Sequence, residues 1–224
     1  MRVMSSLEQV TEQPVAISRD RSRAIFGQTM GLVALTAGVA ALGAYLGRDL
    51  SRGVAMLAII GAIVCIVAMN AAIKRSEQLA IGLLFGMGAL IGVSSGPILA
   101  YYSAVNPSAL WQAAGATALF IGGFGSFGFA TRRDLSIVGR ISFFALLGLI
   151  VFGFVMLFVA IPGGNVIYAV IGLVIFSGYT MYDFQRLRRA GQIEQAPLLA
   201  ASIFLDIFNV FMLLLSLFGG GGRN

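Results

Sequence analysis

The 224-residue sequence contains no histidine, one cysteine and few charged residues. With Cys65 as the single thiol, neither an intrachain disulfide nor a metal site built on His and Cys ligands is possible. Charged side chains make up 11% of the chain, whereas soluble domains carry about a quarter. A chain with so little charge cannot cover its own surface in water. The composition therefore predicts an integral membrane protein without a second globular domain.

Long apolar runs take the place of the missing charge. Hydrophobic residues account for 58% of the chain, and seven runs of about 20 residues match the length that crosses the hydrocarbon core of a bilayer. These runs are Ala24–Gly47, Gly53–Ile73, Leu79–Tyr102, Ala109–Ala130, Ile137–Ala160, Val166–Gln185 and Pro197–Phe218. The predicted fold class is an all-α integral membrane protein, a bundle of seven transmembrane helices. We expect residues 24–219 to form this domain.

Basic residues cluster in alternate connections, which predicts the orientation of the bundle. Twelve of the fifteen Lys and Arg residues lie in the polar tail 1–23 or near residues 74–75, 132–140 and 186–189. The positive-inside rule then predicts a cytoplasmic N-terminal tail and an extracytoplasmic C-terminal end, 220–224. The tail lacks the short apolar core of a signal peptide. The net charge of +6 is explained by topology, so no nucleic-acid partner is expected.

Glycines recur at every fourth position of the third apolar run, as Gly88, Gly92 and Gly96. Small residues at this spacing let helix backbones approach closely in lipid, which favours a packing role. A conduit lined by glycine is the alternative.

Two carboxylates, Asp183 and Asp206, lie inside the last two apolar runs. An ionisable group within a membrane segment costs a few kcal/mol unless it is paired, hydrated or protonated. The midpoint of the pair falls in the connection between the runs, so antiparallel helices would bring the two carboxylates level. Two carboxylates at hydrogen-bond distance cannot easily both ionise, and one shared proton would hold them together. Loss of that proton would turn attraction into repulsion.

Further polar residues share the faces of the two aspartates. Tyr179 and Thr180 precede Asp183 by about one turn, and Ser202 and Asn209 lie on the stripe of Asp206. We expect the two polar faces to meet, either as an interhelical hydrogen-bond clamp or as a site that responds to protons or cations. The two interpretations are compatible. Lys74 and Arg75, at the end of the second run, are candidates for a cationic latch or for simple membrane anchors.

At these residues the sequence resembles the Bax inhibitor-1 family, in its bacterial branch. The resemblance rests on Tyr182-Asp183-Phe184-Gln185-Arg186, on the run from Ala200 to Phe211 around Asp206, and more weakly on Gly96-Pro97-Ile98. It covers the seven-helix span and leaves out the tail. It implies a seventh helix at the centre of the bundle and a location in the bacterial inner membrane.

The resemblance also implies a function, a pH-sensitive calcium leak. Asp183 and Asp206 would form its di-aspartyl sensor and contact calcium transiently, and Lys74 or Arg75 would serve as the latch. The expected partners are the bilayer, calcium ions and protons, with no cofactor and no enzymatic activity. Some relatives carry an acidic residue within the second helix, whereas this sequence has none there before Lys74.

Two other functions remain open at this point. A non-transporting regulator would bind another membrane protein, such as a quality-control protease. An intramembrane aspartyl protease would use the two aspartates for acid–base hydrolysis. The protease interpretation is disfavoured because a Gly-x-Gly-Asp pattern is expected around the second aspartate, and Ile203-Phe204-Leu205-Asp206 stands there instead.

Overall fold

Seven α-helices make up the part of the chain that the computed structural model describes, which is residues 2–192 and 195–220, with side chains from Ser22 onward. They are α1 (Arg2–Gly47), α2 (Arg52–Ala72), α3 (Glu77–Val105), α4 (Pro107–Ala130), α5 (Ser136–Phe158), α6 (Gly164–Arg189) and α7 (Ala196–Gly220). Within those residues there is no strand. Each helix contains a stretch long and apolar enough to cross a membrane, so the predicted all-α architecture with seven spans is confirmed.

The helices begin and end close to the predicted positions, and local chemistry explains several of these ends. The Ser76 hydroxyl oxygen accepts a hydrogen bond from the Leu79 amide at 3.4 Å and caps α3. Pro107 opens α4, where its missing N–H costs nothing. Gly163 precedes α6 with a φ of 69°, a conformation that favours glycine.

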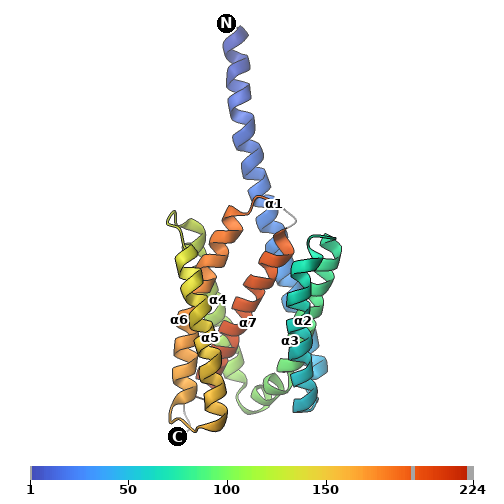
Figure 1. Ribbon diagram of the computed structural model, residues 1–224, viewed down its shortest axis with the longest axis vertical. Helices are drawn as coiled ribbons and strands as arrows, with labels where there is room; N and C mark the ends of the chain where they lie inside the picture. The colour runs from blue at the N-terminus through green and yellow to red at the C-terminus, as the bar shows by residue number, and fades with distance from the viewer. Residues whose placement is uncertain (1, 193–194, 221–224) are drawn as a thin grey trace.

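The N-terminal segment differs from the separate tail that we predicted. Residues 2–47 form one continuous helix, and its first part projects beyond the other six helices (Figure 1). Once the apolar part of α1 is helical, each preceding residue extends an existing helix and needs no new nucleus. The side of the membrane on which this segment lies stays a prediction. Of the expected C-terminal end, residues 221–224 lie outside the described residues.

The bundle consists of two groups of three helices with α7 between them. In one group α3 packs against α1 and α2, and in the other α6 packs against α4 and α5. Helix α7 lies between the groups in Figure 1 and packs against α1, α2, α3, α4 and α6. Of its most apolar stretch 56% is buried, compared with 11% for α5. The expectation of a central seventh helix is therefore confirmed.

The glycines of α3 form the contact surface for α1. A Cβ atom added to Gly88 would collide with Thr36, one on Gly92 would collide with the backbone of Ala40, and one on Gly96 would collide with the end of α1. The packing interpretation is supported at these three positions. On the same helix Gly82 has no neighbour within 4 Å of an added Cβ, so it has no such role.

Candidate functional site

Asp183 lies in the last two turns of α6 and makes an ion pair within its own helix. Its Oδ1 accepts a hydrogen bond from Arg186 Nη1 at 2.9 Å. The spacing of three residues places both side chains on one helix face. The Asp183 side chain is 5% exposed and that of Arg186 is 42% exposed, so the guanidinium reaches from solvent to a buried carboxylate.

Asp206 lies in the middle of α7 and is 4% exposed. It interacts electrostatically with both Asp183 and Arg186 across the α6–α7 contact. Its Oδ2 has no hydrogen-bond partner among the described residues. A buried carboxylate oxygen without a partner is costly, so the Asp206 carboxyl group is poorly compensated where it stands.

The charges around the two aspartates do not balance. Among the described residues, the guanidinium of Arg186 forms an ion pair with Asp183, and no ion pair with Asp206 is present. When both carboxyls are ionised, one negative charge remains without a partner in an apolar part of the bundle. A proton or another cation would compensate it. The chemical capacity of the site is therefore to bind one positive charge.

Three of the four predicted supporting residues fall close to the aspartates or are buried with them. Tyr179 interacts electrostatically with both carboxyl groups, and the Ser202 side chain interacts with Asp183. Thr180 is fully buried, and its hydroxyl has no hydrogen-bond partner within the described structure. Asn209 instead donates to the Leu205 carbonyl of its own helix at 2.8 Å. The predicted approach of the two carboxyls to hydrogen-bond distance stays a prediction.

Lys74 and Arg75 lie in the turn between α2 and α3, and both are exposed. Over the described ranges neither side chain makes an ion pair. The cation paired with Asp183 in this structure is therefore Arg186. Arg186 was expected only as one of the basic residues that orient the bundle, although its position three residues after Asp183 is a signal for this contact.

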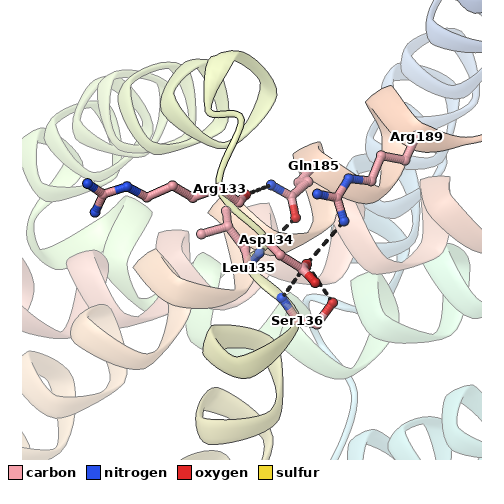
Figure 2. A network of polar contacts seen from close by, with 6 residues as sticks. All are labelled: Arg133, Asp134, Leu135, Ser136, Gln185 and Arg189. Atoms are coloured by element: carbon pink, nitrogen blue, oxygen red, sulfur yellow. Dashed lines mark hydrogen bonds and ion pairs between the residues drawn. The ribbon is translucent and has the colours of Figure 1, made fainter.

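Gln185, which the sequence analysis also missed as a site residue, holds the connection between α4 and α5. Its side chain is buried, its Oε1 accepts from the Leu135 amide at 2.9 Å, and its Nε2 donates to the Arg133 carbonyl at 2.7 Å. Figure 2 shows the amide reaching both backbone groups. The connection is thereby tied to the helix turn that carries Asp183 and Arg186.

Asp134 adds a second, exposed tie between the same connection and α6. Its Oδ1 accepts from the Ser136 amide at 3.1 Å, from the Ser136 hydroxyl at 2.8 Å and from Arg189 Nη1 at 3.1 Å (Figure 2). The Ser136 hydrogen bonds, followed by the Arg189 contact, hold the pKa of the Asp134 carboxyl below its usual range. This carboxylate, which is charged at neutral pH, accepts hydrogen bonds from Ser136, the first residue of α5.

The site offers little to a resident metal ion. Within the described residues, no group of three or more His, Cys, Asp or Glu side chains comes together. Calcium takes six to eight oxygen ligands, so two aspartates would supply only part of a shell.

Comparison with known proteins gives one family and several bacterial relatives. Residues 22–223 match the family described as "Inhibitor of apoptosis-promoting Bax1". A protein of Deinococcus radiodurans is 34% identical over 197 residues, which cover 83% of this chain and 84% of that protein. The inner membrane protein YbhL of Escherichia coli is 27% identical over 172 residues, or 72% of each chain. Protein YrjE of Lactococcus lactis is 29% identical over 169 residues, 72% of this chain and 71% of its own.

Proposed function

The chain belongs to the Bax inhibitor-1 family, and from this premise we propose that it is a pH-sensitive cation leak, with calcium as the favoured ion, controlled by Asp183 and Asp206. One observation carries the proposal, the unbalanced charge of two buried carboxyl groups beside the single guanidinium of Arg186. The second positive charge that balances the two carboxylates can be a proton or a passing cation.

The position of the pair supports control of a pathway through the bundle. Asp206 belongs to the central helix α7, and Asp183 belongs to α6, which packs against it. With one proton bound, the pair attracts, and α6 and α7 stay together. Without it, two like charges repel and push the helices apart. The gate is then a two-state contact between α6 and α7, biased by protons and by cations.

Calcium fits the donor atoms of the site. Carboxylate, hydroxyl and carbonyl oxygens are the ligands of calcium, and Asp183, Asp206 and Thr180 supply oxygens on neighbouring helices. Because the ligand set is incomplete, we propose that the ion contacts the pair in transit.

The proposed counter-ion of the present state is Arg186. Lys74 and Arg75 are exposed in the α2–α3 turn and remain candidates for a latch that would act in another state. We place the chain in a bacterial inner membrane, the location stated for the relative YbhL, with the N-terminus in the cytoplasm. Reporter fusions after Tyr102 and after Arg133 should report opposite sides.

Calcium influx into proteoliposomes at several pH values tests the proposal. The proteins are the wild type, Asp183→Asn and Asp206→Asn. An Asn keeps a neutral hydrogen-bonding group opposite the remaining aspartate, so each variant should lose the pH dependence. Asp183→Asn also releases Arg186 and should raise basal flux, whereas Asp206→Asn keeps the Arg186 ion pair and should leave the gate tighter. Wild-type pH dependence in both variants would exclude the pair as the sensor. Folded wild type without flux at any pH would favour the non-transporting regulator.

A further inference from the structure

We propose that a phosphate group binds in a cleft of about 340 Å³ where α6 ends and α7 begins, and that it shares Arg186 with Asp183. Arg186, Arg189 and Tyr182 line the cleft from α6, and Gln195 lines it just before α7. The volume lies at the lower end of the range for small-molecule sites, roughly 300–1,000 Å³. The phosphate is either free or part of a lipid headgroup, since both present the same oxygens.

The two arginines have donors to spare. Each guanidinium carries five N–H groups, and in the described structure each makes one recorded ion-pair contact through Nη1, Arg186 with Asp183 and Arg189 with Asp134. Their side chains are 42% and 46% exposed. A phosphate can therefore bind both guanidinium groups without breaking either ion pair. The planar fork of arginine matches phosphate oxygens in pairs, and a phosphate has enough oxygens to meet both guanidinium groups.

The walls of the cleft favour an anion over a cation. No acidic side chain is among the lining residues that the structure describes. The tyrosine hydroxyl and the Gln195 amide are further hydrogen-bond donors, and Leu198 and Leu199 close the apolar side. The carbonyl end of α6 and the amide end of α7 both lie here, and their opposite partial charges offset each other. The arginines are the charged groups of the described lining, and the carboxylates paired with them, Asp183 and Asp134, lie outside it.

The connection to the aspartate pair is the shared guanidinium. A phosphate bound to Arg186 draws part of its positive charge away from Asp183, so it favours the protonated pair. Binding itself does not depend on the proposed leak, but an effect on the pH profile of calcium flux rests on that proposed function.

Calorimetric titration with inorganic phosphate in detergent tests the site directly. Arg189→Gln should weaken binding about tenfold or more, because it removes a charged donor. Arg188→Gln removes the same charge one position away, outside the cleft, and should change affinity less than about twofold. Gln195→Ala alters the opposite wall and leaves both ion pairs intact, so reduced affinity there supports the site without risk to the fold.

The source of the phosphate is resolved with nanodiscs. If inorganic phosphate still binds when the protein is in phosphatidylcholine nanodiscs, the ligand is a soluble phosphate. If the wild type and Arg188→Gln retain phosphatidic acid during native mass spectrometry and Arg189→Gln does not, the ligand is a lipid headgroup.

No binding of either probe, or an equal loss of affinity in Arg188→Gln and Arg189→Gln, would overturn the proposal. Binding without any change in the pH profile of a functional wild type would overturn the sharing of Arg186. Binding to a protein that shows no flux would count against the leak alone.

Discussion

Replacement of Arg186 by glutamine is the sharpest test of how charge is arranged at the aspartate pair. The change removes the guanidinium whose Nη1 lies 2.9 Å from Asp183 Oδ1 and leaves a shorter, uncharged polar side chain. Ionised Asp183 then loses its recorded cationic partner, while the protonated form loses much less. Deprotonation of the pair should therefore require a higher pH, whichever protonation state conducts.

The size of the effect follows from the exposure of the two side chains. Breaking a fully buried ion pair costs about 3–5 kcal/mol, and an exposed pair contributes about 0.2–1 kcal/mol. Here one partner is 5% exposed and the other 42%, so solvent screens the pair in part and about 2 kcal/mol is the appropriate estimate. That free energy corresponds to an upward movement of the pH midpoint by about 1.5 units.

Two measurements check this shift. The first is the pH at half-maximal calcium influx into liposomes, and the second is the infrared absorption of protonated carboxyl groups, which reports protonation without requiring flux. Arg188→Gln is the matched control, because it removes the same charge from the same helix turn without touching Asp183. An unchanged or lower midpoint in Arg186→Gln would refute the assigned counter-ion. An equal shift in Arg188→Gln would point instead to general surface charge.

Three further predictions concern the packing around the site. Gln185→Ala should lower the free energy of unfolding, measured by denaturation in detergent, by about 1–3 kcal/mol for each of the two backbone groups that it leaves unpaired. The control Gln112→Ala, at an exposed position of α4, should have little effect. Gly92→Val should separate α1 from α3 and lower the midpoint temperature of unfolding, because a side chain there would collide with the α1 backbone. The control is Gly82→Val, which should be tolerated because Gly82 faces open space. An equal fall in midpoint temperature for both variants would contradict the packing argument. The lowered pKa of Asp134 means that its contribution to stability is present above the ordinary carboxyl pKa and is lost as the pH falls through the folded-state pKa. Asp134→Asn should therefore flatten the acid side of the plot of unfolding free energy against pH. An unaltered plot would argue against a stabilising role of Asp134 at the start of α5.

Much of the architecture could be predicted from local sequence properties. The seven spans, their approximate ends and the central place of α7 follow from apolar length and from a family resemblance in the last two helices. The spacing of Gly88, Gly92 and Gly96 predicted a close helix contact, and the structure shows that α1 is the partner. The continuous helix from Arg2 was missed, because a polar composition indicates solvent exposure and does not report whether an adjoining helix continues.

The sequence predicts which residues belong to the site better than it predicts their contacts. Asp183 and Asp206 stand out because an ionisable residue in a long apolar run is conspicuous without any knowledge of neighbours. Lys74 and Arg75 were the candidates for the partner of Asp183, since they end the second helix on the same predicted side. The structure pairs Asp183 with Arg186 instead, three residues further along its own helix.

Hydrophobic length and charge are properties of the residues in order, so the sequence predicts seven membrane-length helices and two carboxylates within them. The ion pair of Asp183 with Arg186 also follows from spacing, because the two residues lie three positions apart on α6. Contacts with other elements are set by the tertiary structure: the rotation of α6 turns Gln185 toward the α4–α5 connection, and the packing of α7 leaves Asp206 Oδ2 without a hydrogen-bond partner among the described residues. Such contacts depend on the relative rotation of neighbouring helices, which is set by side-chain packing over the whole bundle.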